Sequence, residues 1–253
     1  MKLLRLFTLF LLVFALSCSD DDSSDIENGT NKNPNLKATG SSAHDFLSDD
    51  EYDSLVVEIF YVENFRPNSQ TLTNWKNFME ARLNKPGGIT FSETEIESPG
   101  NSPYTLDEIT AIENNIRTKY NSPNVLTMFV LFLDGKFTTD TSNTFTLGTA
   151  YRNTSFVIYE NSIQILSNNV AGANRTRMET TVVLHEFCHL LGLVNFGTKM
   201  QNPHQDTAHG QHCNNDECLM FWQAENNMAS GIMNNIPQLD SNCLADLRAN
   251  GGK

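Results

Sequence analysis

Residues 184–195 read L-H-E-F-C-H-L-L-G-L-V-N, and this stretch holds the side chains best suited to chemistry. His185 and His189 are four positions apart, so on a helix they project from the same face, one turn above the other. Two imidazoles on one face can share a metal cation, and Glu186 can reach a water molecule in the open position of that cation. The pattern predicts a zinc site on a helix.

The surroundings of this pattern strengthen the prediction. Residues 178–191 carry apolar side chains at Val182, Val183, Leu184, Phe187, Cys188, Leu190 and Leu191. A helix that is apolar on every side is expected to be buried. Buried imidazoles and a buried carboxylate each cost several kcal/mol without partners, and a zinc ion with its water supplies those partners.

A zinc site that keeps one position open for water needs a third protein ligand. The stretch 203–213 supplies three of the six histidines of the chain, His204, His209 and His212. Polar, histidine-rich loops are usually exposed to solvent, but one of these three residues is expected to return to the metal. The local sequence leaves all three as candidates.

The same residues resemble the metzincin metallopeptidases, and in particular the archaemetzincins. The metzincin pattern is H-E-x-x-H-x-x-G-x-x-H followed by a methionine turn, and archaemetzincins continue from the third histidine as H-C-x4-C-x-M. Residues 212–220 of this chain read H-C-N-N-D-E-C-L-M. The resemblance implies His185, His189 and His212 as zinc ligands, Glu186 as general base and Met220 beneath the metal.

The chain departs from that pattern in two places. Asn195 stands where the third histidine is expected, and His212 lies twenty positions after Gly192 instead of three, so residues 195–211 are interpreted as an inserted loop. The later Cys-x-x-Cys with which archaemetzincins complete a second, structural zinc site is represented by Cys243 alone. Cys213, Cys218 and Cys243 could form a disulfide or bind a second metal, and the sequence leaves both alternatives open. Met233 is the alternative to Met220 as the methionine of the methionine turn.

The remaining pattern predicts the elements that position this site. Apolar runs, alternation and capping residues indicate strands at 54–62, 89–96, 125–133 and 155–159, and helices at 71–83, 106–120, 178–191 and 239–249. Thr105 and Glu108 form a capping box, and Asp240 is an N-cap. The order predicts an α+β fold with a mixed twisted sheet, an active-site helix and a loop-rich C-terminal subdomain.

The beginning of the chain has the composition of an export signal. Basic Lys2 and Arg5 precede an apolar run, and residues 15–18 read A-L-S-C, similar to a bacterial lipobox. We expect a signal peptide at 1–17, a disordered tether at 18–45 lipidated on Cys18, and one domain at 46–253. An ordinary secretory signal is the alternative. The acidic run after Cys18 resembles the surface-export signals of Bacteroidetes lipoproteins, and this resemblance implies an outer-membrane lipoprotein exposed at the cell surface.

The formal net charge of −13 argues against nucleic acid as a partner. The motif favours a zinc-dependent endopeptidase, expected to be a monomer, with a peptide or protein substrate. An edge strand at 155–159 is expected to bind an extended peptide. The alternative is a surface lipoprotein that holds its metal structurally and cleaves nothing; the intact Glu186 argues against it. The sequence does not give the substrate or the cleavage preference.

Overall fold

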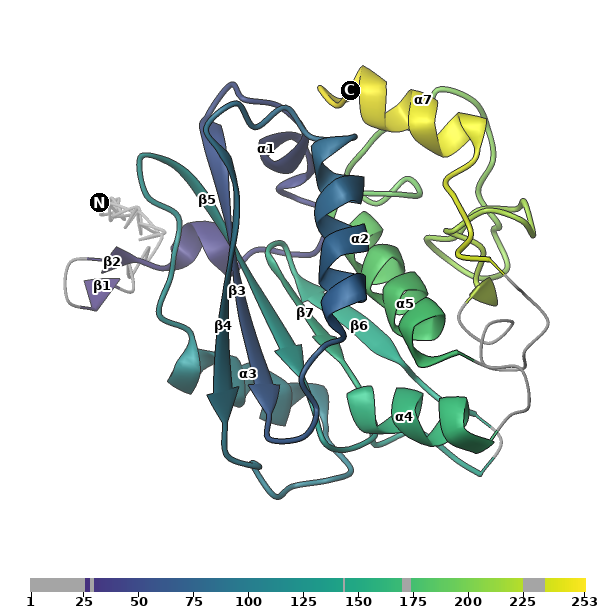
Figure 1. Cartoon of the computed structure of the whole chain (residues 1–253). Helices are drawn as coiled ribbons and strands as arrows, with labels where there is room; N and C mark the ends of the chain where they lie inside the picture. Colours follow the sequence, from purple (N-terminus) through teal and green to yellow (C-terminus); the bar gives the residue numbers. More distant parts are fainter. Residues whose placement is uncertain (1–25, 28–29, 143, 170–173, 225–234) are drawn as a thin grey trace, which may run out of the picture.

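The computed structural model describes residues 26–27, 30–142, 144–169, 174–224 and 235–253. Its centre is a five-stranded sheet with the order β4-β3-β5-β7-β6 (Figure 1). The strands are β3 (Tyr52–Val62), β4 (Gly88–Ile96), β5 (Asn124–Phe132), β6 (Gly148–Arg152) and β7 (Ser155–Ile158). All are parallel except β6, which runs antiparallel to β7. The predicted mixed sheet is confirmed.

Helices cover both faces of the sheet. The α-helices of the described residues are α1 (Ala43–Leu47), α2 (Ser69–Glu80), α3 (Leu106–Ile116), α4 (Glu160–Asn169), α5 (Arg175–Leu190) and α7 (Ser241–Ala249). The capping box of Thr105 and Glu108 begins α3, and Asp240 caps α7 through the Cys243 amide, as predicted. Near the N-terminus a short 3-10 helix (Asn33–Asn35) follows the antiparallel pair of strands β1 (Ile26–Glu27) and β2 (Thr30–Asn31). No helix in the described ranges is long and apolar enough to cross a membrane.

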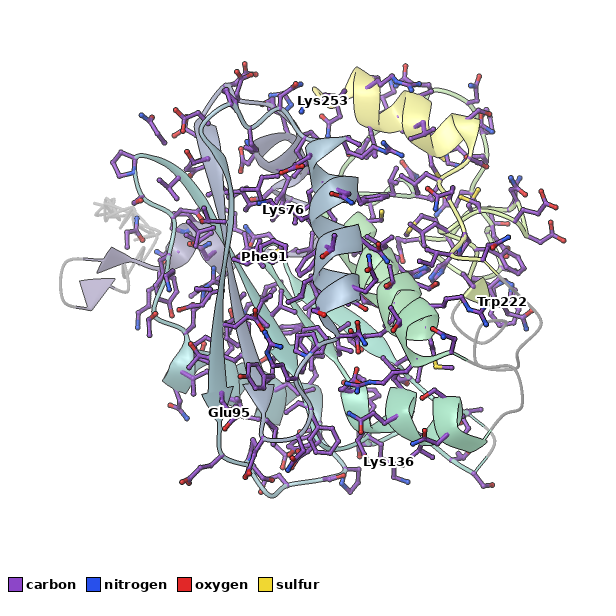
Figure 2. The ribbon with its side chains drawn as sticks, in the orientation of Figure 1. Lys76, Phe91, Glu95, Lys136, Trp222 and Lys253 are labelled. Carbon is purple, nitrogen blue, oxygen red and sulfur yellow. The ribbon has the colours of Figure 1, made fainter. Side chains whose placement is uncertain are left out.

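The strands contribute side chains to two apolar layers, one on each face of the sheet, because successive side chains of a strand point to opposite faces. On β3, Leu55, Val57 and Ile59 belong to the larger core under α2 and α5, whereas Phe60 and Val62 pack with α3 on the other face. Trp75 of α2 is fully buried between the sheet and α5, and its ring contacts Phe91, Phe156 and Phe187 at centroid distances of 5.3, 5.6 and 5.9 Å. Phe91 is labelled in Figure 2. This core fixes α5, the helix with the predicted ligands, on the sheet.

The strand predicted as the sheet edge, 155–159, lies inside the sheet. As β7, it pairs with β5 on one side and with β6 on the other, so β6 and β4 are the edges. Residues 148–152 read G-T-A-Y-R and have no apolar run. Their extended conformation comes from antiparallel pairing with β7 across a tight turn, which single-strand patterns do not reveal.

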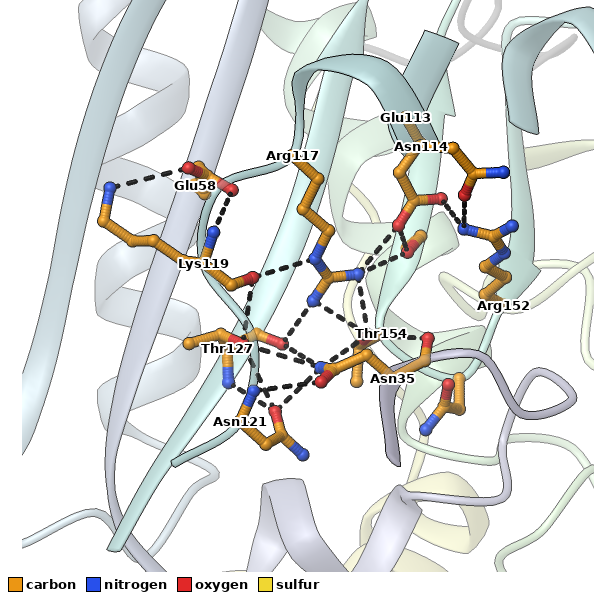
Figure 3. A network of polar contacts seen from close by, with 12 residues as sticks. Asn35, Glu58, Glu113, Asn114, Arg117, Lys119, Asn121, Thr127, Arg152 and Thr154 are labelled. Atoms are coloured by element: carbon orange, nitrogen blue, oxygen red, sulfur yellow. Dashed lines mark hydrogen bonds and ion pairs between the residues drawn. The ribbon is translucent and has the colours of Figure 1, made fainter. Parts of the chain in front are cut away.

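A buried polar network ties the N-terminal segment to the sheet (Figure 3). Arg117 and Glu113, whose side chains are both fully buried, form an ion pair of 2.7 Å, and Arg152 adds a second one to Glu113 at 2.8 Å. The Asn35 amide donates to the Thr127 carbonyl at 3.1 Å and to the Thr154 hydroxyl at 3.2 Å. The folded part of the chain therefore includes residues 33–45, which the sequence assigned to a tether.

Candidate metal centre

Helix α5 brings two of the predicted ligands together. Asn174 caps its first turn by accepting a hydrogen bond from the Arg177 amide, and nearly all of its residues from Met178 onward are buried. His185 and His189 lie one turn apart on the helix face that leaves the core, with their ring centroids 4.9 Å apart. The apolar sequence of the helix thus places two imidazoles at the border between core and solvent.

His212 is the third member of the cluster. Its ring centroid lies 5.2 Å from both other rings, and its Nε2 atom is 3.2 Å from Nε2 of His185. One nitrogen of each of the three rings lies within 4.8 Å of the others. The two remaining candidates from the same loop are directed elsewhere.

Backbone carbonyls fix the orientation of all three rings. The Nδ1 atoms face the oxygens of Leu219 at 2.8 Å, Leu193 at 3.3 Å and His209 at 2.6 Å, for His185, His189 and His212 respectively. Each Nδ1 carries a proton in order to donate to its carbonyl, so each Nε2 presents a lone pair to the other two. Three converging lone pairs repel one another unless a cation lies between them.

Burial keeps these rings neutral. It lowers the pKa of His185 to about 4 and the pKa of His189 well below its usual value, and it lowers the pKa of His212 as well. A neutral imidazole is the form that binds a metal. Three neutral nitrogens with one side open to solvent fit the donor set of a catalytic zinc ion.

The other two histidines of the inserted loop have different neighbours. His209 is partly exposed; its ring stacks on Trp222 at a centroid distance of 3.8 Å, and its Nδ1 lies 2.6 Å from the Asp206 carboxylate. His204 is 1% exposed, and its Nε2 lies 2.8 Å from the Asp246 carboxylate. His212 alone of the three contacts the pair on α5.

The inserted loop leaves and returns at one point. The Val194 amide donates to the Gln211 carbonyl at 3.3 Å, which places His212 next to the end of α5 despite the long sequence separation. Beyond it, the Cys213 amide donates to the Met220 carbonyl at 2.7 Å, and Met220 is fully buried next to Leu219, whose carbonyl orients His185. Met233 lies outside the described residues.

Glu186 lies between the histidines and the edge of the sheet. It is 5% exposed, and its Oε2 accepts a hydrogen bond of 2.7 Å from the amide of Ala150 on β6. A Cβ atom at Gly148 would lie only 2.5 Å from Cγ of Glu186, so the missing side chain makes room for the carboxylate. Neither residue could be found from sequence patterns, because Ala150 contributes a backbone amide and Gly148 contributes space.

A cleft of about 440 Å³ opens over the three histidines and Glu186. One wall is β6, and the other contains His212 and Gln211 at the end of the inserted loop. Three aromatic side chains line the cleft: Phe145, Phe196 and Trp222. The arrangement brings a metal donor set, a carboxylate and a strand edge to one open groove.

The cysteines of the described residues, Cys188, Cys213, Cys218 and Cys243, all have free thiols and are buried. Cys188 lies within α5, whereas the other three come together beside His204. Hydrogen bonds from Cys213 and Cys243 lower the pKa of the Cys218 thiol to about 4. Among these residues the structure contains sulfur atoms in contact rather than a disulfide.

Comparisons with known proteins place the fold. No protein-family model matches the chain, and no curated protein matches it in sequence. Among solved structures, an archaemetzincin from Methanopyrus kandleri is similar with a TM-score of 0.50 at 12% identity, over 78% of this chain and 96% of that one. The chain has an archaemetzincin-like fold.

Proposed function

We propose that the chain is a zinc-dependent endopeptidase in which His185, His189 and His212 hold the metal and Glu186 is the general base. The observation that carries the proposal is the convergence of three Nε2 atoms, each fixed through Nδ1, beside a carboxylate in an open cleft. The archaemetzincin-like fold supports the same function. A purely structural metal site would have no use for Glu186.

The residues divide the chemistry among them. A zinc ion held by the three imidazoles would polarise the scissile carbonyl and acidify a water molecule. Glu186 accepts the proton of that water and returns it to the leaving amine. The Ala150 amide donates to the Glu186 carboxylate at 2.7 Å and so holds the general base in one orientation toward its water molecule.

The substrate is proposed to lie along β6. This strand pairs with β7 on one side only, and its outer side borders the cleft that contains Glu186. An extended peptide can add to such an edge through backbone hydrogen bonds, which bind peptides of many sequences. Side chains of the peptide would then meet the aromatic wall of Phe145, Phe196 and Trp222.

Replacement of Glu186 by glutamine tests this function. Glutamine keeps an oxygen acceptor for the Ala150 amide, so the Glu186→Gln chain should fold and retain its zinc but lose peptide cleavage by a factor of about 100 or more. Glu217→Gln, at an exposed position, is the matched control and should keep full activity. Unchanged cleavage by Glu186→Gln would refute the mechanism, and a zinc-loaded wild type that cleaves no peptide would favour the non-catalytic lipoprotein.

We further propose that the mature chain is a lipoprotein of the cell envelope, anchored through Cys18 and possessing no nucleic-acid partner. The support is the basic and apolar start of the sequence, the A-L-S-C motif and the acidic run that follows it. Mass spectrometry of the membrane fraction should find a diacylglyceryl group on Cys18. A soluble secreted chain cleaved at another position would contradict the anchor.

A further inference from the structure

A segment near the N-terminus, residues 33–43, contacts two parts of the chain that line the cleft. The first contact is with the turn after β6. The Asn153 amide donates to the Lys37 carbonyl at 2.9 Å, and the Lys37 amide donates to Oδ1 of Asn153 at 3.0 Å. The Asn153 side chain also donates to the Pro34 carbonyl at 2.7 Å and to the Ser42 hydroxyl at 2.9 Å. Because Asn153 is fully buried, these bonds hold the segment against the end of β6.

The second contact is a crossing of the same segment with the backbone of the inserted loop. Gly40 and Gly197 meet here, with φ angles of +79° and +131° that favour glycine. A Cβ atom at residue 40 would lie 1.6 Å from the carbonyl oxygen of Phe196, and one at residue 197 would lie 2.1 Å from the carbonyl oxygen of Gly40. Carbon and oxygen atoms in nonbonded contact stay about 3.3 Å apart, so no side chain fits on either residue.

Phe196, whose carbonyl takes part in this crossing, lines the cleft. Its ring is perpendicular to the ring of His189, with a centroid distance of 6.2 Å and an interplanar angle of 89°. The amides of Phe196 and Thr198 donate to the Gly192 carbonyl at 2.9 and 3.1 Å. The backbone that carries the Phe196 ring is therefore held by the end of α5 and by the contact with Gly40.

The lining of the cleft indicates which substrate side chains Phe196 would contact. Among the described residues, Glu186 and the three histidines are the only ionisable groups of this lining, and Phe145, Phe196 and Trp222 supply its large apolar surfaces. A substrate side chain beside the cleaved bond would meet aromatic rings, which stabilise large apolar groups by burial and aromatic groups further through ring contacts. The lining therefore favours phenylalanine or leucine over alanine or a charged residue.

We propose that Phe196 is a specificity-determining residue that selects a large apolar side chain beside the cleaved bond, and that residues 33–43 position it. The inference rests on the proposed peptidase function. The segment joins the backbone of Phe196 to the end of β6, the strand whose Ala150 amide holds Glu186. It thereby fixes the substrate-binding ring relative to the general base.

Binding of a matched peptide pair tests the proposal. The full-length, zinc-loaded chain with Glu186→Gln is titrated with two decapeptides that carry either phenylalanine or alanine at both central positions. The Kd of the alanine peptide should be about tenfold higher or more, because it lacks the ring contact. Adding Phe196→Ala should reduce this ratio to about threefold or less.

Gly40→Ala tests the N-terminal segment without changing a residue of the cleft. The added Cβ atom should displace the Phe196 backbone by about 1.7 Å, so the ratio should fall as far as in Phe196→Ala. The two substitutions together should lower it no further, because both act through the same ring. Gly100→Ala is the matched control: residue 100 has a φ of +75° and open space around it, so the ratio should stay unchanged.

If Gly40→Ala does not fold, Asn153→Ala takes its place, because it releases the segment from β6 without a steric conflict. Equal Kd values for the two peptides, or an unchanged ratio in Phe196→Ala, would overturn the proposal. An unchanged ratio in the folded variant of the segment would overturn the role of residues 33–43. A wild type that cleaves no peptide would refute only the proposed function, since the titration of the Glu186→Gln chain does not depend on cleavage.

Discussion

The absence of a side chain at residue 148 predicts a specific defect in the Gly148→Ala chain. The added Cβ atom would lie 2.5 Å from Cγ of Glu186 and 2.9 Å from Cγ1 of Val182. Nonbonded carbon atoms prefer about 3.5–4.0 Å, so Glu186 has to move by about 1 Å or β6 has to withdraw. Such overpacking costs about 1–3 kcal/mol of folding stability.

The effect on catalysis should exceed the effect on stability. A displacement of about 1 Å in a catalytic group lowers the rate by about 100-fold, and it also weakens the hydrogen bond between Glu186 and the Ala150 amide. Because the three atoms nearest to the added Cβ belong to Glu186 and Val182 and not to a histidine, zinc content should stay that of the wild type. The assay is kcat/KM for a peptide substrate, measured beside zinc content and the urea midpoint.

Gly100→Ala is the matched control for this substitution. Residue 100 has open space around its Cα atom but a φ of +75°, so alanine there costs about 1–2 kcal/mol through the backbone alone. It should lower stability by a similar amount and leave kcat/KM unchanged. If Gly148→Ala keeps activity within threefold of the wild type, the contact with residue 148 does not position Glu186 and the reasoning fails.

Three further predictions concern stability. Arg117→Met should lower the free energy of unfolding by about 3–5 kcal/mol in urea titrations, because it removes one of the two cations paired with the buried Glu113; a loss below 1 kcal/mol would contradict this. Asn35→Ala should cost about 1–3 kcal/mol, and a chain that begins at residue 46 should lose more, seen as a lower Tm. In the metal-free chain, the pKa of His185 is about 4 in the folded state and about 6.5 in the unfolded state, so the unfolded state binds the extra proton between these two pH values. The free energy of unfolding should therefore fall by up to about 3 kcal/mol as the pH drops from about 6.5 to about 4. Urea midpoints that do not change with pH would refute this prediction.

Local sequence was sufficient where a structural element carries its own signal. The continuous apolar run of β5, the helical spacing of Trp75 and Phe78 in α2, and the capping box of Thr105 and Glu108 all depend on residues close together in the chain. The predicted zinc helix belongs to the same class, since its two histidines are four positions apart. These elements lie where the patterns placed them, except that α3 ends at Ile116 and not at residue 120.

The remaining features depend on contacts between distant residues. His204 and His209 lie in the same polar loop but have different surroundings. His204 is buried, and the carboxylate of Asp246, 42 positions away, accepts a hydrogen bond from its ring. The ring of His209 stacks on Trp222. The sequence around Asn35 is typical of a polar tether, and its hydrogen-bond partners Thr127 and Thr154 are far away along the chain. The edge position of β6 likewise follows from pairing with β7 and from no feature of its own five residues.

The hydrogen bond from the Val194 amide to the Gln211 carbonyl closes the inserted loop, and this has a consequence for the spacing of metal ligands along a chain. Once these two residues are joined at 3.3 Å, the geometry at the metal no longer depends on how many residues lie between them. The entropy of closing a loop grows only logarithmically with its length, so nineteen residues between Gly192 and His212 instead of two cost about 2 kcal/mol. The sequence position of a third ligand can therefore change at little energetic cost while its position in the folded structure stays the same.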